Sequence, residues 1–202
     1  MISMVAATGN PHKLEEFARI LAPLGIEVIS PRELGVKVEV EETGNTFAEN
    51  AYLKAKAFFE ATGKPSLADD SGLCVDALGG RPGVYSARYH GENTSYAEKM
   101  AALLAELEGV PEERRTARFT CAICCVLDKD TVLRAEGHCE GVIGYQPRGT
   151  NGFGYDPILY REGRSMAELS DEEKDAVSHR GKALRAFAQL LEATLQSRQL
   201  QN

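Results

Sequence analysis

The chain of 202 residues contains no tryptophan, only five cysteines and no apolar run long enough for a membrane-spanning helix. The cysteine count is odd and three of the five lie within residues 121–125, so the paired framework of a disulfide-rich secreted protein is disfavoured. The first residues show neither a positively charged segment nor the apolar core of a signal peptide. We therefore expect a cytoplasmic protein with no membrane partner.

Positive charge is also scarce. Lysine and arginine number 23 against 30 aspartates and glutamates, which gives a net charge of −7. Such a chain lacks the basic surface that binds nucleic-acid polymers non-specifically or binds anionic membranes. Its 43% hydrophobic and 26% charged residues contain no low-complexity tract, so the composition is that of a globular protein and excludes a collagen, a coiled coil or a disordered tail.

Cys121 and Cys124 form a C-x-x-C motif, but the surrounding sequence predicts a β-strand. Residues three positions apart on a strand point to opposite faces, so the two thiols cannot hold one metal ion. We interpret the cysteine cluster as small packing residues rather than as a zinc or redox site.

Hydrophobic periodicity predicts an α/β fold on a mixed sheet. Strands are expected over residues 2–7, 26–29, 66–68, 116–128 and 131–140, with a hairpin turn at 128–130 and with 69–72 breaking the third strand. Helices are expected after Pro11, from the capping boxes Thr46–Glu49 and Ser95–Glu98, and over 183–195. No long linker divides the chain, which favours a single domain, residues 1–202, with two lobes around a central cleft.

The segment Thr8-Gly9-Asn10-Pro11-His12-Lys13 lies between a predicted strand and a predicted helix. A helix N-terminus offers backbone N–H groups and the positive end of a dipole to an anion, and Lys13 adds a charge. The spacing matches neither a Walker loop nor a dinucleotide fingerprint. A phosphate cradle and simple helix capping by Asn10 are equally open.

Two acidic segments suggest a magnesium site. Glu39, Glu41 and Glu42 precede one turn, and Asp69 and Asp70 precede another. Mg²⁺ is held by one or two carboxylates together with water and phosphate oxygens. The alternative is that these acids decorate solvated turns. Adjacent Asp69 and Asp70 are expected to point in different directions.

Further candidates have both a functional and an ordinary interpretation. Lys54 lies on a mostly apolar helix face, where it either extends its amine to solvent or aims it at a phosphate. Phe153, between two glycines, either stacks on a flat base or packs in the core. Lys174 and the segment Ser178–Gly181 group hydrogen-bond donors before the last helix, where surface charge is the ordinary interpretation.

Together these segments resemble the inosine triphosphate pyrophosphatase family, also called dITP/XTP pyrophosphatases. Order and spacing agree over about residues 2–195, and several motifs in register are more specific than any one alone. The matching motifs are Thr8-Gly9-Asn10 with Lys13, Glu41-Glu42-Thr43-Gly44 with Thr46-Phe47 and Glu49-Asn50-Ala51, Lys54-Ala55, Asp69-Asp70-Ser71-Gly72-Leu73, Pro82-Gly83-Val84-Tyr85-Ser86-Ala87-Arg88-Tyr89, Gly152-Phe153-Gly154-Tyr155-Asp156-Pro157 and Ser178-His179-Arg180-Gly181.

The resemblance implies an elongated mixed sheet flanked by helices, a homodimer, Mg²⁺ as cofactor, and cleavage of ITP, dITP and XTP to a monophosphate and pyrophosphate. It implies that Asp70 is the general base and a metal ligand with Glu42, although neighbouring Glu41 is an alternative ligand. The remaining implied roles are in substrate binding: the phosphates at Thr8, Gly9, Asn10, Pro11, His12, Lys13 and Lys54, the substrate at Ser71, and the base at Phe153, Gly154, Tyr155, Asp156, Lys174, His179 and Arg180.

Hydrogen-bond donors near His179 and Arg180 suit the 6-oxo acceptor of a deaminated purine. A 6-amino group would leave these donors unpaired, at a cost of about 1–3 kcal/mol each. Two other functions fit the same residues: a non-catalytic purine nucleotide sensor, and a pyrophosphatase for modified pyrimidine or methylated nucleotides.

Overall fold

The computed structural model describes residues 2–200, and these group into two compact units. The first unit takes its described residues from 2–70, 121–137 and 180–200, and the second from 71–120 and 138–179. The single domain and the cleft expected from the sequence stay predictions, and each unit is described by itself. No helix among residues 2–200 is both long and apolar enough to cross a membrane.

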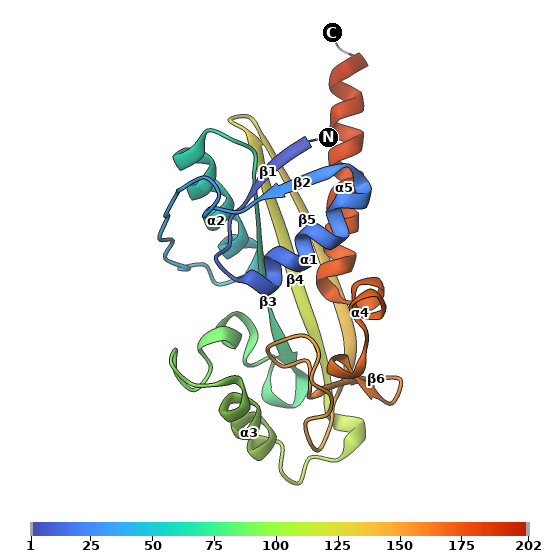
Figure 1. The fold of residues 1–202 in the computed structure, drawn as a ribbon. Coiled ribbons are helices and arrows are strands. Elements are labelled where there is room, and N and C mark those ends of the chain that lie inside the picture. The colour runs from blue at the N-terminus through green and yellow to red at the C-terminus, as the bar shows by residue number, and fades with distance from the viewer. Residues whose placement is uncertain (1, 201–202) are drawn as a thin grey trace. The chain divides into compact units, whose positions relative to one another are not determined.

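A seven-stranded sheet with the order β2-β1-β3-β4-β5-β6-β7 forms the framework (Figure 1). β1 pairs in parallel with β2 and β3, whereas β6 pairs antiparallel with β5 and β7, so the predicted mixed sheet is confirmed. The strands are β1 (Ile2–Ala6), β2 (Ile26–Ile29), β3 (Ser66–Val75), β4 (Thr116–Asp128), β5 (Thr131–Ile143), β6 (Leu159–Arg161) and β7 (Arg164–Ser165).

In the first unit, helices cover both faces of the sheet (Figure 1). α1 (Pro11–Leu21) and α5 (His179–Leu200) pack on one face around Phe17 and Phe187, and α2 (Phe47–Thr62) packs on the other around Phe58. Cys121 lies in the first of these cores and Cys124 in the second. The two thiols therefore point to opposite faces of β4, as predicted, and none of the five cysteines forms a disulfide bond among residues 2–200.

The second unit has its own core around Leu73, Leu103 and Ile158. α3 (Tyr96–Glu106) and α4 (Asp171–Val177) belong to it, and both begin with capping boxes. Short 3-10 helices complete the two units at η1 (Ala22–Leu24), η2 (Asp76–Leu78), η3 (Gly83–Arg88), η4 (Glu112–Arg114) and η5 (Met166–Glu168).

The register of β1 and β3 explains how two distant segments meet. Ala6 lies opposite Leu67 in the parallel pair, so the loop that follows β1 runs beside Asp69 and Asp70. The expectation that β3 ends before Asp69 is wrong, because the strand continues to Val75. The two aspartates lie inside a strand rather than in a turn, because cationic and amide side chains from other elements bind their carboxylates.

The last helix is also longer than predicted. Its hydrophobic pattern starts at Ala183, yet α5 begins at His179 and continues to Leu200. The predicted capping box at Thr46 is confirmed, and the helix that it begins, α2, ends at Thr62. Hydrophobic periodicity locates only the apolar part of a helix. The first turn of α5 is polar, and its Arg180 side chain contacts residues that are distant in the sequence.

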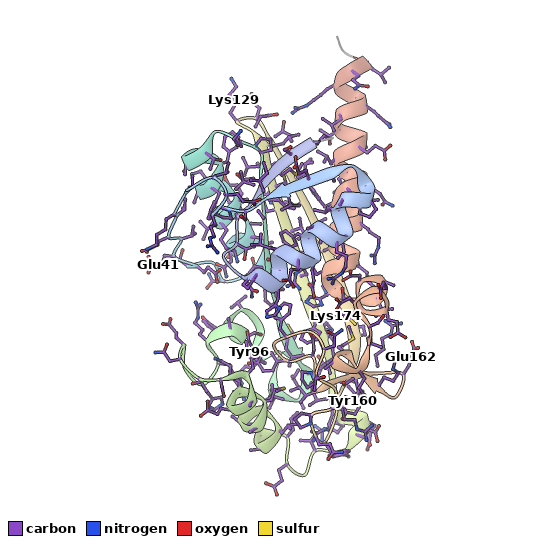
Figure 2. The ribbon with its side chains drawn as sticks, viewed as in Figure 1. Glu41, Tyr96, Lys129, Tyr160, Glu162 and Lys174 are labelled. Carbon is purple, nitrogen blue, oxygen red and sulfur yellow. The ribbon has the colours of Figure 1, made fainter. Side chains whose placement is uncertain are left out.

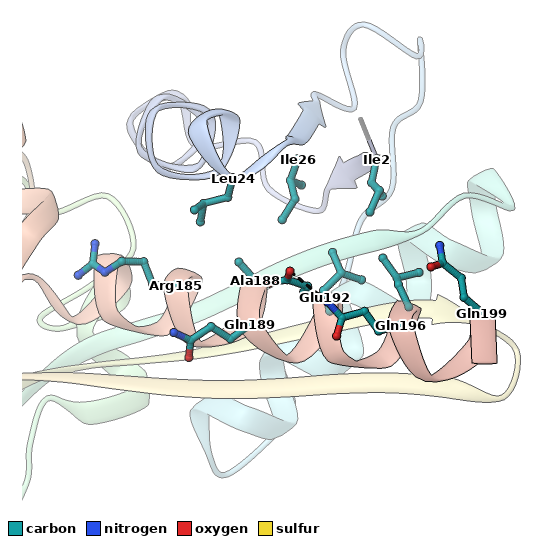
Figure 3. Close-up of a pocket in the computed structure, with 11 residues that line it drawn as sticks. Ile2, Leu24, Ile26, Arg185, Ala188, Gln189, Glu192, Gln196 and Gln199 are labelled. Carbon is teal, nitrogen blue, oxygen red and sulfur yellow. Dashed lines mark hydrogen bonds between the residues drawn. The ribbon is translucent and has the colours of Figure 1, made fainter. Parts of the chain in front are cut away.

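A groove of about 490 Å³ lies in the first unit between α5 and the strands β1 and β2 (Figure 3). Its apolar side chains include Ile2, Leu24 and Ile26, and α5 contributes Arg185 and Glu192. None of the site residues predicted from the sequence lines this groove.

Candidate functional site

Lys54 lies between the two carboxylates that were predicted to hold a metal. Its Nζ atom is 2.7 Å from Oε1 of Glu42 and 3.1 Å from Oδ1 of Asp70. The lysine side chain is only 13% exposed, so the ordinary interpretation of a solvent-directed amine is wrong. Glu41 is exposed and lies on the outside of the loop before α2 (Figure 2), which favours Glu42 as the acid that acts with Asp70.

Asn50 ties this acidic loop to β3. Its fully buried side chain donates from Nδ2 to Oδ2 of Asp70 (3.3 Å) and accepts at Oδ1 from the backbone N–H of Gly44 (2.8 Å). A Cβ atom on Gly44 would lie 2.6 Å from the same Oδ1 atom, so only glycine allows this approach. The loop that carries Glu42 is thereby fixed against the Asp70 carboxylate.

Asp69 points away from its neighbour and binds two cations. Its Oδ1 atom is 2.9 Å from Nζ of Lys13, and its Oδ2 atom accepts from Nε and Nη2 of Arg180 at 3.2 and 3.0 Å. Arg180 also donates from Nη1 to Oε2 of Glu16 at 2.6 Å. The expectation that Asp69 and Asp70 diverge is confirmed, since they contact different sets of residues.

The two aspartates have opposite electrostatic environments. Burial alone would raise the pKa of Asp69, but Lys13, Arg180 and Lys54 outweigh it and hold that pKa well below its ordinary value. Burial raises the pKa of Asp70, and repulsion from Glu42 and Asp69 adds to this against the attraction of Lys54. Asp69 is therefore a fixed anion, whereas Asp70 binds a proton more readily than an ordinary aspartate.

The carboxylates also determine the charge of Lys54. Burial by itself would lower the pKa of this amine, but Asp70, Asp69 and Glu42 raise it above the ordinary lysine value. Lys54 is accordingly a permanent cation at neutral pH. It can bind a phosphate oxygen as a charged donor.

The loop after β1 contains both arrangements that the sequence left open. Asn10 caps α1, because its Oδ1 atom accepts from the backbone N–H groups of His12 (3.0 Å) and Lys13 (3.4 Å), and Pro11 occupies the first helical turn. Thr8 Oγ1 accepts from the Asn10 N–H at 3.2 Å. The Lys13 side chain is 16% exposed and carries three donor protons, so it can hold Asp69 and a further anion together.

The donor set of Glu42 and Asp70 suits a hard divalent cation. Both are carboxylates, and the structure brings them to one positive centre, the Lys54 ammonium. Mg²⁺ commonly takes one or two protein carboxylates and completes its shell with water and substrate phosphate. Among residues 2–200, no group of three or more His, Cys, Asp and Glu side chains gathers as a metal cluster, so any ion here depends on those outside ligands.

In the second unit, Asp156 organises the glycine-rich loop. Its Oδ2 atom accepts from the backbone N–H of Phe153 (2.9 Å) and from Nζ of Lys174 (2.8 Å), which also lies 4.9 Å from the centre of the Phe153 ring. Asp156 and Lys174 are both buried. A Cβ atom on Gly152 would lie 2.2 Å from the same Asp156 oxygen, so the loop requires glycine there.

Other predicted residues of the second unit lie around this loop or support it. Tyr155 is buried and donates to the backbone oxygen of Ser86 at 2.9 Å, and Tyr96 of α3 meets its ring edge to face. Gly154 approaches the Tyr96 ring, while His179 stacks on Phe119 with ring centres 4.8 Å apart. Ser71 is half-buried on β3, next to Asp70 in the sequence.

The sequence-based prediction assigned no role to Asn50, Glu16 or Tyr96. Asn50 is an amide within a helix, and a buried amide needs hydrogen-bond partners. Its place in the Glu49-Asn50-Ala51 motif could therefore have indicated a hydrogen-bonding role. Glu16 lies three residues after Lys13 on α1, a spacing that puts opposite charges on one helix face. Nothing in the sequence identifies Tyr96, which reaches Tyr155 only through the fold.

A sequence profile of the Ham1 family matches residues 4–190. The dITP/XTP pyrophosphatase of Bacillus subtilis (strain 168) is 49% identical over 195 residues, which cover 96% of this chain and 98% of that protein. The dITP/XTP pyrophosphatase of Yersinia pseudotuberculosis serotype I (strain IP32953) is 51% identical over 195 residues, 95% of this chain and 98% of the relative. A solved HAM1 protein from Coxiella burnetii is 43% identical and has a TM-score of 0.86, with 96% of this chain and 100% of that one covered.

Proposed function

The chain belongs to the Ham1 family, and from this membership and its site we propose that it hydrolyses deaminated purine nucleoside triphosphates. The substrates are ITP, dITP and XTP, and the products are the nucleoside monophosphate and pyrophosphate. The reaction removes these nucleotides from the pool. Because nucleoside triphosphates are pooled in the cytoplasm, the protein acts there.

One observation carries this proposal: the Lys54 ammonium is held between the carboxylates of Glu42 and Asp70. This group combines a cation for phosphate with two ligands for a divalent ion. Glu42 and Asp70 would hold Mg²⁺, which supplies charge neutralisation to phosphate oxygens when bound. The hard oxygen donors of the two side chains support magnesium over a thiophilic metal.

Asp70 acts as the general base. Burial and repulsion from Glu42 and Asp69 raise its pKa, which makes it a better proton acceptor than an ordinary aspartate. It orients a water molecule and takes one proton from it as the oxygen attacks the α-phosphorus. The bond from the α-phosphorus to the bridging oxygen breaks in line, and pyrophosphate leaves.

Lys13 and Lys54 bind the triphosphate and stabilise the charge that develops on pyrophosphate. Both are only partly exposed, and both are held by carboxylates that set their direction. Placed cations of this kind act where charge develops in the transition state and need no rearrangement at that moment.

Phe153 stacks on the base, and Lys174 and His179 donate to its 6-oxo group. The Asp156 carboxylate supports this role, because it fixes both the Phe153 backbone and the Lys174 amine. A 6-amino purine would leave buried donors unpaired, which disfavours ATP by about 10-fold or more for each lost hydrogen bond.

We also propose a homodimer, which the family resemblance implies, with the groove beside α5 as its contact. Arg185 and Glu192 are two turns apart on α5, so antiparallel packing of two copies would place opposite charges together. Light scattering should give twice the 22.0 kDa chain mass. The Leu24→Asp variant, whose substitution lies within the groove, should be a monomer. The control variant Leu200→Asp, whose substitution lies outside the groove, should remain a dimer. If the Leu24→Asp variant is still a dimer, the groove is not the dimer contact.

The test of function is incubation with ITP, XTP, GTP and ATP in the presence of Mg²⁺ and identification of the products. We expect IMP and pyrophosphate from ITP, with slower turnover of GTP and ATP. Orthophosphate with a diphosphate, or equal turnover of all four nucleotides, would contradict the proposal. Tight ITP binding without turnover at any divalent metal would instead identify a nucleotide sensor.

A further inference from the structure

Four charged side chains from three distant elements form a ring in the first unit, in which three ion pairs join them and the backbone of α1 closes the circuit between Lys13 and Glu16. Lys13 and Glu16 come from α1, Asp69 from β3 and Arg180 from α5. Asp69 binds Lys13 through Oδ1 (2.9 Å) and Arg180 through Oδ2, and Arg180 returns to α1 through Glu16 (2.6 Å). Two positive and two negative charges make the ring neutral.

The ring is buried except at one corner. Glu16, Asp69 and Arg180 are 5%, 1% and 2% exposed, and they lie next to core residues such as Phe17. Buried ion groups are expensive to desolvate, and apolar side chains of similar size often stabilise a fold as well or better. Only Lys13 extends from the ring toward solvent, which suggests that the ring determines where this amine lies.

The geometry of Arg180 directs Lys13 in two ways. Nε and Nη2 of Arg180 both contact Oδ2 of Asp69, so the carboxylate is turned with Oδ1 toward Lys13. Glu16 is three residues after Lys13 on α1, where it would attract the lysine along the helix face. Arg180 binds the Glu16 carboxylate instead and leaves Lys13 directed to Asp69.

We propose that Arg180 is a positioning residue for Lys13 and acts on the triphosphate end of the substrate rather than on its base. The proposal rests on the function proposed above. It differs from the role in base recognition that the family resemblance implies for Arg180, and the two roles predict different changes in substrate selectivity.

The experiment compares Arg180→Gln, Arg180→Lys and Lys13→Met by calorimetry with inorganic tripolyphosphate, which has no base, and by ITP and ATP kinetics. We expect Arg180→Gln to weaken tripolyphosphate binding about tenfold, as for loss of one charged hydrogen bond, and to leave the ITP/ATP ratio of kcat/KM unchanged. Arg180→Lys should recover part of the affinity. Adding Arg180→Gln to Lys13→Met should weaken binding no further.

Arg115→Gln provides the matched control. Arg115 is an equally buried arginine of the second unit, whose guanidinium binds the backbone oxygens of Leu107, Ile143 and Gly144. Its variant should lose stability but keep tripolyphosphate affinity, which separates positioning from general destabilisation. Glu16→Gln serves as a second ring variant if Arg180→Gln does not fold, and it should weaken tripolyphosphate binding in the same way.

A collapse of ITP/ATP selectivity with tripolyphosphate affinity unchanged would overturn the proposal and assign Arg180 to the base. Failure of the wild-type protein to bind tripolyphosphate would also contradict it. Absence of ITP turnover alone would contradict the proposed function, yet the tripolyphosphate comparison would still test the link between Arg180 and Lys13.

Discussion

Asp69 and Asp70 are consecutive residues of β3 whose carboxyl pKa values are shifted in opposite directions. Burial opposes ionisation of both. Two cations, Lys13 and Arg180, reverse that effect at Asp69, whereas burial prevails over the attraction of Lys54 at Asp70. Because successive strand residues face opposite sides, one dipeptide supplies a structural anion and a proton acceptor.

We predict that Asp69→Asn and Asp70→Asn separate stability from activity. Asp69→Asn breaks buried ion pairs and should lower the free energy of unfolding by about 3 kcal/mol. Asp70→Asn removes a carboxylate whose ionised form the fold disfavours, so its melting temperature at pH 7 should equal or exceed that of the wild type. Turnover of ITP should fall about 100-fold or more, as for loss of a general base.

Thermal unfolding and steady-state kinetics of both variants check this prediction. A large loss of stability in Asp70→Asn with turnover retained would reverse the roles of the two residues.

The pH dependence of stability should follow Asp69. Its pKa in the folded protein lies below the unfolded value of 3.8, so its stabilisation is complete above that value and is lost as the pH falls below it. Urea unfolding between pH 5 and pH 2 should show a smaller loss of stability for Asp69→Asn than for the wild type. Equal slopes for the two proteins would exclude Asp69 as a source of acid sensitivity.

Glu42→Gln should lower the pKa of Asp70. Repulsion from Glu42 is one cause of the raised value, and the variant removes that charge while the Lys54 cation remains. The Asp70 carboxyl signal can be followed by ¹³C NMR in metal-free protein. An unchanged or higher midpoint in Glu42→Gln would show that the two carboxylates do not interact as the structure indicates.

The buried pair of Asp156 and Lys174 predicts non-additive variants. Asp156→Asn leaves the Lys174 ammonium buried without its carboxylate, which should destabilise the protein by about 3 kcal/mol and raise KM for ITP more than it lowers kcat. Lys174→Met in the same chain removes the second charge and should restore much of the stability, but not the KM. Simple addition of the two stability losses would refute this coupling.

The cysteines should be chemically inert in the native protein. Burial raises the pKa of Cys124 to about 11 and that of Cys125 to about 12, and it also raises the pKa of Cys121. Iodoacetamide at pH 8 should modify none of the three until the protein unfolds, as mass spectrometry can establish. Rapid labelling of Cys121 or Cys124, or release of zinc from the pair, would restore the C-x-x-C hypothesis.

Local rules in the sequence predicted much of the fold. The capping boxes at Thr46 and Ser95 define where α2 and α3 begin, since the motif depends only on residues within one turn. The hairpin turn predicted at residues 128–130 is likewise the two-residue connection between β4 and β5. The divergence of Asp69 and Asp70 was predicted as well, but for neighbours in a turn, whereas the structure produces it by the alternation of side chains along β3.

The partners of the charged residues were not predictable in this way. The polar run after Ala68 has the composition of a turn, and it continues as a strand because Lys13, Lys54, Asn50 and Arg180 bind its carboxylates. Those residues are distant from β3 in the sequence. An ion pair between residues that are distant in the sequence produces no pattern in the sequence around either of them. The contacts of Arg180 are therefore visible only in the structure.

We propose that a water molecule, deprotonated by Asp70, attacks the α-phosphorus of a deaminated purine triphosphate. Hydrolysis of ITP in H₂¹⁸O, with mass analysis of both products, tests it most directly. Attack at the α-phosphorus predicts one ¹⁸O atom in IMP and none in pyrophosphate. Label in pyrophosphate, or in orthophosphate, would show that water attacks another phosphorus atom.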